Sequence, residues 1–232
     1  MKVPWLTKER ISEAASGLVA DYEAVAGHSI TPPIPVEDII EKYLGLRLSF
    51  EDLEKILGLK DVLGATYVGA RQICINERLL EKSSEGRLIF TCAHEVGHWV
   101  LHRQYAEVQT RQASNHEVIV CRTRNAGERI EWQADYFAGC LLVPQREVVD
   151  AFHKAFGRDT LVLHNQKSAI GPPITFVDPC VENWAYIAGM VCEEGGFTNV
   201  SRHAMIIRLQ ELGLLINLTD TPVGWRESSK TG

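Results

Sequence analysis

Hydrophobic residues recur at helical spacing in several parts of the chain. Between residues 8 and 26, apolar side chains follow one another three or four positions apart, which predicts an amphipathic helix. A second, short helix follows the prolines of TPPIPVEDIIEKYLGL and ends at Gly45. The next segment, LGATYVGARQICIN, has two apolar runs on either side of Gly69 and Ala70, a pattern typical of a β-hairpin.

Two longer helices are predicted in the middle of the chain. The first begins at Ser83 or Ser84 and runs to about His102, and the second covers AGERIEWQADYFAGCLLVP, ending before Pro144. Residues 103–126 show little periodicity, which predicts an irregular segment with room for one strand. The glycines and prolines of residues 157–180 predict a long loop, and two short helices follow near residues 182–193 and 201–212.

Composition excludes several classes of function. The 232 residues are 45% hydrophobic and 23% charged, as in ordinary folded domains. A formal net charge of −6 argues against a general binder of nucleic acids or anionic membranes. No apolar run reaches the roughly 18 residues of a membrane span, and the start of the chain lacks a signal-peptide pattern. We therefore expect a cytoplasmic protein.

The stretch TCAHEVGHWVLH combines an apolar helical pattern with ionisable side chains. Because a helix advances about 100° per residue, His94 and His98 lie one turn apart on the same narrow stripe. Buried imidazoles are costly unless something satisfies them, and two neutral imidazoles at this spacing can bind one Zn²⁺. Glu95 projects from the edge of the stripe, where its carboxylate can reach a water on the metal. This is the H-E-x-x-H arrangement of zinc peptidases.

A catalytic zinc ion needs a third protein ligand and an open position for water. The metzincin pattern requires a glycine seven residues and a histidine ten residues after the first histidine. It is excluded because these positions hold Leu101 and Gln104. The later sequence EWQAD places Glu131 and Asp135 one helical turn apart. We predict that Glu131 is the third ligand and that Asp135 accepts the second N–H of a ligand imidazole.

Other polar residues compete for these roles. Glu128 and His116 are rival third ligands. His102 lies about 80° around the helix from His94 and two turns along it, so we interpret it as a polar helix-end residue rather than a ligand. Small residues on the second helix, which include Ala134 and Gly139, allow the two helices to approach closely.

Five segments resemble, in this order, the ImmA/IrrE family of metallopeptidases, which are gluzincin-type zincins: IPVEDIIEKYLGLRL, ICINERL, RLIFTCAHEVGHWVLHR, EWQADYFAGCLLVP and VSRHAMIIRLQELGLL. The resemblance implies that His94, His98 and Glu131 bind zinc and that Glu95 is catalytic. It also implies an α+β fold, in which a mainly helical zincin-like core with a small β-sheet precedes a C-terminal helix-turn-helix-like helical segment.

These observations predict three regions. Residues 1–156 form the metallopeptidase domain, residues 157–180 a loop insertion, and residues 181–232 the C-terminal helical module. The second helix of this module offers Arg202, His203 and Arg208 as its cations, with several glutamates nearby. A helix that reads DNA usually carries a denser basic stripe. We therefore favour packing or protein recognition over direct DNA binding.

Members of the resembled family cleave helix-turn-helix repressors in mobile elements or stress responses. The resemblance thus implies a site-specific endopeptidase with such a repressor as its partner, in which Glu95 is the general base for metal-activated water. Tyr67, His116, Tyr136 and Arg71 are candidates for stabilising the oxyanion, and the strand QICIN is interpreted as pairing with an extended substrate. The alternative is a zinc-stabilised, non-catalytic scaffold that controls a repressor by binding, and the presence of Glu95 favours the enzyme.

Overall fold

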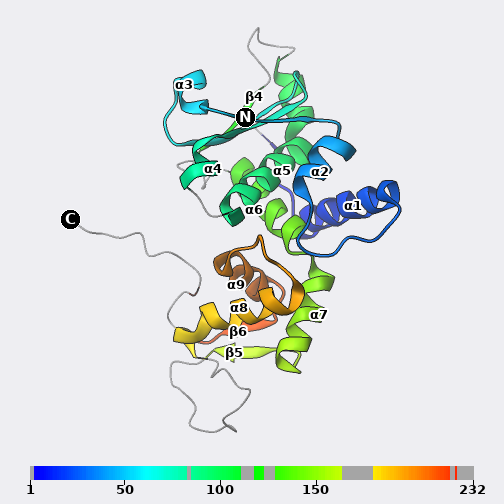
Figure 1. Ribbon diagram of the computed structural model, residues 1–232, viewed down its shortest axis with the longest axis vertical. Coiled ribbons are helices and arrows are strands. Elements are labelled where there is room, and N and C mark those ends of the chain that lie inside the picture. Colours follow the sequence, from blue (N-terminus) through cyan, green and yellow to red (C-terminus); the bar gives the residue numbers. More distant parts are fainter. Residues whose placement is uncertain are drawn as a thin grey trace, which may run out of the picture. The chain divides into compact units, whose positions relative to one another are not determined.

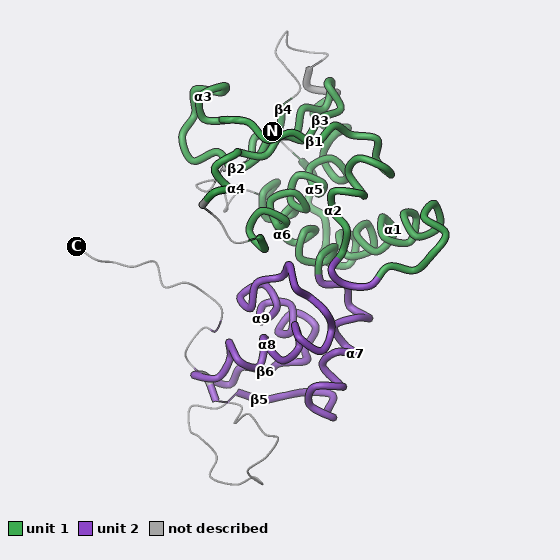
Figure 2. Tube along the Cα trace, in the orientation of Figure 1, with its two compact units in different colours: residues 1–30, 34–142 green, residues 31–33, 143–232 purple. Residues whose placement is uncertain are grey.

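The structure of the protein is a computed structural model that describes residues 3–82, 85–110, 118–122, 129–163, 180–219 and 223. The chain forms two compact units (Figure 2). Unit 1 contains residues 1–30 and 34–142, and unit 2 contains residues 31–33 and 143–232. Among the described residues, no helix combines the length and the apolar character that a membrane span requires.

Unit 1 begins with the helices that the sequence predicts. Helix α1 covers Lys8–Ala26, with Thr7 as its N-cap, and ends at Gly27, whose φ of 76° lies in the left-handed region. Helix α2 (Val36–Asp38) continues directly into the π-helix η1 (Ile39–Tyr43). The chain then turns at Gly45, where φ is 61°. The predicted helical segments before residue 46 are therefore confirmed.

A mixed four-stranded sheet follows, in the order β1-β3-β2-β4. Its strands are β1 (Arg47–Glu51), β2 (Val62–Tyr67), β3 (Gln72–Asn76) and β4 (Val118–Arg122). The short helices α3 (Leu53–Leu57) and α4 (Arg78–Lys82) lie between these elements in the sequence. Strands β2 and β3 form the predicted antiparallel hairpin, and β1 pairs in parallel with β3. Because β3 already pairs on both sides, the prediction that QICIN pairs with a substrate is wrong.

Two long helices complete unit 1, and in Figure 1 α5 lies between the sheet and α6. Helix α5 covers Glu85–Thr110 and α6 covers Arg129–Leu142. The end predicted for α5 near His102 is wrong. Arginine is a good helix former, and Leu101 and Ala106 both bury their side chains, so the apolar side of the helix continues past that point. With its helices and its mixed sheet, the protein has the predicted α+β fold.

Unit 2 contains α7 (Gln145–Phe156), β5 (Leu161–Leu163), the 3-10 helix η3 (Val181–Asn183), α8 (Trp184–Gly195), α9 (Arg202–Glu211) and β6 (Leu215–Asn217). Strands β5 and β6 pair in parallel. The predicted loop of residues 157–180 therefore contains a strand, because Leu161 and Leu163 bury alternate side chains. Residues 164–179 of that loop lie outside the described residues.

The two predicted helices near the C-terminus are present as α8 and α9. Ser201 caps α9 by accepting a hydrogen bond from the backbone N–H of Ala204 at 3.1 Å. Arg208, however, is not a surface cation as the sequence suggested. Its side chain is buried, and its Nε donates to the carbonyl oxygen of Val143 at 3.1 Å. Helix α9 therefore presents fewer cations than we predicted.

Candidate metal centre

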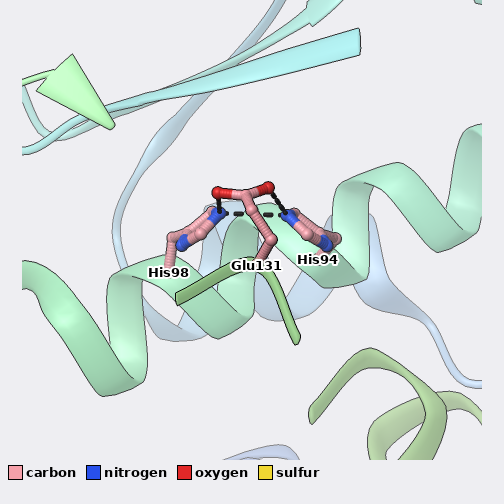
Figure 3. Close-up of side chains that lie close together, drawn as sticks. All are labelled: His94, His98 and Glu131. Atoms are coloured by element: carbon pink, nitrogen blue, oxygen red, sulfur yellow. Dashed lines mark hydrogen bonds and ion pairs between the residues drawn. The ribbon is translucent and has the colours of Figure 1, made fainter. Parts of the chain in front are cut away.

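Three buried side chains of unit 1 point toward one another (Figure 3). His94 and His98 come from successive turns of α5, and Glu131 comes from the first turn of α6. The two Nε2 atoms are 2.9 Å apart. The carboxylate oxygens of Glu131 lie 3.3 Å from Nε2 of His94 and 3.5 Å from Nε2 of His98. Two nitrogens and one carboxylate thus converge on one point.

A close approach of the two helices makes this convergence possible. A Cβ atom added to Gly97 would lie only 3.1 Å from the Cα atom of Ala134 on α6. Glycine and alanine at this crossing allow the backbones to come together, as the sequence suggested. Gly139, which we also expected to serve the approach, does not contribute to this contact, because a Cβ atom added there would meet no described residue of another element within 4 Å.

Burial and neighbouring side chains set the protonation states of His98 and Glu131. Burial lowers the pKa of His98 to about 4, so its imidazole is neutral near pH 7. Burial acts to raise the pKa of Glu131, but the neighbouring ring nitrogens of His94 and His98 outweigh this effect and lower the pKa to about 2. A neutral imidazole and an ionised carboxylate are the forms in which these side chains bind metal ions.

The residues present fit a metal ion. A tetrahedral ion such as zinc, with ligand atoms at about 2.0–2.1 Å, separates these atoms by roughly 3.3 Å. The observed separations of 2.9, 3.3 and 3.5 Å are close to this spacing. The donor set of two imidazoles and one carboxylate also matches sites that keep one position open. The buried group of His94, His98 and Glu131 can therefore bind a metal ion.

Asp135 lies where the sequence analysis placed it, behind His94. Its Oδ1 is 2.7 Å from Nδ1 of His94, and its side chain is 43% exposed. A carboxylate that accepts the Nδ1–H keeps the proton on that nitrogen and leaves the lone pair of Nε2 facing Glu131.

Glu95, the next residue after His94 on α5, faces strand β2. Its side chain is fully buried, and its Oε2 accepts a hydrogen bond of 2.6 Å from Oγ1 of Thr66. Oε1 has no hydrogen-bond partner among the described residues. Burial raises the pKa of Glu95 to about 7, although His94 and the Thr66 hydroxyl act in the opposite direction. One oxygen of this carboxylate is thus held in place while the other is available.

The absence of a side chain at Gly64 in β2 makes room for Glu95. A Cβ atom there would lie 2.5 Å from Oε1 of Glu95. We expect Gly64→Ala to displace the carboxylate, to destabilise the fold by about 1–3 kcal/mol, and to lower any activity that depends on Glu95. Gly139→Ala is the matched control, because among the described residues the added Cβ atom would meet no atom within 4 Å beyond its own stretch of α6. Denaturant unfolding of both variants checks this, and equal stabilities would contradict it.

The candidates for oxyanion stabilisation lie in different places. Tyr67 packs with the cluster around Leu53, on the face of the sheet opposite to Thr66. Arg71 donates to the carbonyl oxygen of Leu44 at 2.8 Å and lies over the ring of Trp99. Tyr136, next to Asp135 in the sequence, stacks on Trp132. The structure thus does not bring these candidates together.

Two residues that the sequence offered for roles at the site lie outside the described part of the chain. His116, both a rival ligand and an oxyanion candidate, lies outside the described residues, and so does the rival ligand Glu128. The three candidate ligands that converge, His94, His98 and Glu131, all lie in the described parts of α5 and α6.

Sequence reasoning missed one part of the centre. The interpretation of His102 as a polar helix-end residue is wrong, because its side chain is fully buried and α5 continues to Thr110. Its Nδ1 lies 3.1 Å from Nδ1 of His98, and its Nε2 lies 2.9 Å from Oε1 of Gln133. The available signal was the regular spacing of His94, His98 and His102 along one stripe of the helix.

Comparison with known proteins identifies the family. The model of a peptidase family, described as the IrrE N-terminal-like domain, matches residues 41–165. The chain belongs to this family, which confirms the resemblance to the ImmA/IrrE metallopeptidases. No curated protein matches the sequence. Among solved structures, the chain is similar to a Mycobacterium tuberculosis transcriptional regulator, with 15% identity and a TM-score of 0.41. That match covers 86% of this chain and 51% of the regulator, so the chain spans about half of the regulator's length.

Proposed function

We propose that the protein is a zinc-dependent, site-specific endopeptidase that cuts a helix-turn-helix transcriptional repressor. The observation that carries this proposal is the state of Glu95. It is a fully buried carboxylate beside the candidate ligands, with one oxygen held by Thr66 and the other without a partner among the described residues. A site that used a metal only for stability would have no need of such a group, so Glu95 favours an enzyme over a scaffold.

His94, His98 and Glu131 would hold the zinc ion, and Asp135 would keep His94 in the required tautomer. When bound, zinc supplies Lewis-acid chemistry, since it lowers the pKa of water in its open position and polarises a carbonyl oxygen. Zinc is the ion we favour because two imidazoles, one carboxylate and an open position are typical of catalytic zinc sites.

Glu95 would move the proton. A pKa of about 7, raised by burial, suits a group that must take up and release a proton near neutral pH. Oε1 would accept the proton from the attacking water and then return it to the leaving amine. The hydrogen bond from Thr66 to Oε2 would hold the carboxylate in one orientation during both transfers.

The substrate class follows from the family. Because related metallopeptidases cleave helix-turn-helix repressors, we propose a repressor of this kind, encoded near the protein's own gene, as the partner. Tyr136, which lies on the same helix as Glu131 and next to Asp135, remains a candidate for stabilising the oxyanion. His116 remains a second candidate for this role.

The test is a cleavage assay with the purified protein and this repressor. We expect zinc-loaded protein to cut the repressor at one or a few sites, which mass spectrometry of the products would locate. Treatment with a chelator should stop cleavage, and added zinc should restore it. Casein should be digested poorly, because a protease inside the cell must spare other proteins. Binding of the repressor without cleavage, by fully zinc-loaded protein, would instead support the scaffold.

A further inference from the structure

A line of buried polar side chains leads away from the candidate metal centre. Nδ1 of His98 lies 3.1 Å from Nδ1 of His102. Nε2 of His102 lies 2.9 Å from Oε1 of Gln133, and Nε2 of Gln133 donates to the carbonyl oxygen of Pro4 at 2.9 Å. His98, His102 and Gln133 all have fully buried side chains. The line therefore connects a candidate ligand on α5, through α6, with the segment that precedes α1.

The end of this line sets the direction of every hydrogen bond in it. The carbonyl oxygen of Pro4 can only accept, so the amide of Gln133 must present Nε2 to Pro4 and Oε1 to His102. Because Oε1 also can only accept, His102 must carry its proton on Nε2. In a neutral imidazole the other nitrogen then holds a lone pair, so Nδ1 of His102 accepts from Nδ1–H of His98.

These hydrogen bonds also determine the tautomer of His98 at the metal centre. With its proton on Nδ1, the ring of His98 has its lone pair on Nε2, the atom that faces Glu131 and His94. This is the tautomer in which Nε2 can bind a metal ion. The fixed Pro4 carbonyl thus selects the binding tautomer of His98 through two intervening side chains.

The segment that supplies this carbonyl is itself attached to α6. The ring of Trp5 stacks on the ring of Trp132, with centroids 5.0 Å apart. Nη1 of Arg129 donates to the carbonyl oxygen of Val3 at 3.4 Å. Contacts on both sides of Pro4 therefore hold its carbonyl against Gln133.

We propose that His102 and Gln133 are positioning residues for the metal ligand His98, with the Pro4 carbonyl as their fixed end. The two histidine ligands would then be oriented by different means. His94 relies on the half-exposed carboxylate of Asp135, whereas His98 relies on a buried, uncharged line of hydrogen bonds. This proposal rests on the proposed function only in assuming that His94, His98 and Glu131 bind zinc.

Zinc affinity tests the roles of the two residues. We expect His102→Leu and Gln133→Met to weaken zinc binding by about 10–100-fold, as is typical when a group that orients a metal ligand is lost. His102→Asn should recover most of the affinity relative to His102→Leu, because its amide oxygen can accept from Nδ1–H of His98. Thr91→Val is the matched control. It removes a buried hydroxyl of α5 that donates to the carbonyl oxygen of Arg87, outside the line.

Competition between each variant and a chelating dye for zinc would measure these affinities. Equal affinity of the wild-type protein, His102→Leu and Gln133→Met would overturn the proposal. Loss of zinc by Thr91→Val to the same extent would also overturn it, because the effect would then be a general result of disturbing α5.

A second measurement needs no variant. In zinc-loaded wild-type protein, long-range ¹H–¹⁵N correlation spectra report which ring nitrogen of each histidine carries a proton. We expect His102 to be protonated on Nε2 alone. A proton on Nδ1 of His102, or on both nitrogens, would overturn the proposal even where zinc binds normally. If the wild-type protein bound no zinc, the metal centre itself would be rejected. Failure of the proposed function can therefore be distinguished from failure of the positioning roles of His102 and Gln133.

Discussion

Replacement of Glu95 by glutamine is expected to lower the rate of repressor cleavage by about 10²–10⁴-fold while zinc stays bound. Glutamine has nearly the same shape, and its amide oxygen can still accept the hydrogen bond that Thr66 now donates to Glu95. It cannot take up a proton at that position. The measurement is the single-turnover rate of cleavage, with the zinc content of each preparation determined in parallel.

The stability of Glu95→Gln provides the control. Burial disfavours the charged form of Glu95, as its raised pKa of about 7 shows, so a neutral amide should not destabilise the fold. The variant should also still bind the repressor. Cleavage at the wild-type rate would contradict the role of Glu95 as the base. Relief of repression in cells by Glu95→Gln, to the same extent as by wild type, would show that contact rather than proteolysis is the mechanism.

Loss of a single ligand is expected to abolish tight zinc binding. We expect wild-type protein to retain about one zinc ion per chain after dialysis, because three protein ligands hold it. His98→Ala and Glu131→Ala should each lose the ion under the same conditions. Elemental analysis of the dialysed proteins checks this prediction.

Variants elsewhere in the chain make the ligand test specific. His153→Ala is a matched control, because His153 is a half-exposed histidine of α7 that lies near Asp159 and belongs to unit 2. It should retain zinc. Full zinc occupancy in Glu131→Ala, together with loss of zinc in His116→Ala or Glu128→Ala, would show that the third ligand is wrongly assigned.

The pair of helices around the centre could be predicted because its signal is local. The spacing of His94 and His98 places both rings on one face of a helix, and the apolar residues between them identify that helix. Glu131 and Asp135 give the same kind of signal on α6. Spacing along a helix therefore predicted which residues meet, and the structure shows the distances between them.

The role of His102 could not be predicted in this way, because it depends on contacts between residues far apart in the sequence. Gln133 is 31 residues from His102, and Pro4 is 129 residues from Gln133. No periodic pattern links these three positions. The line of hydrogen bonds forms only when α6 packs against both α5 and the segment before α1.

The order of the strands in the sheet could not be predicted from the sequence for a similar reason. The β2–β3 hairpin joins two segments that are adjacent in the sequence, and its turn residues predicted it. The parallel pairing of β1 with β3 depends on tertiary packing, and it fills the edge of β3 that we had assigned to a substrate. Strand β5 was missed because its partner, β6, lies more than 50 residues further along the chain.

Anomalous diffraction at the zinc edge would show whether one zinc ion is bound between α5 and α6. In crystals of the purified protein, we expect a single anomalous peak between Nε2 of His94, Nε2 of His98 and the carboxylate of Glu131. The peak should lie about 2.0–2.1 Å from each nitrogen. Crystals of protein shown to contain zinc, with no peak at these three residues or with the peak at other side chains, would show that these residues do not form the zinc site.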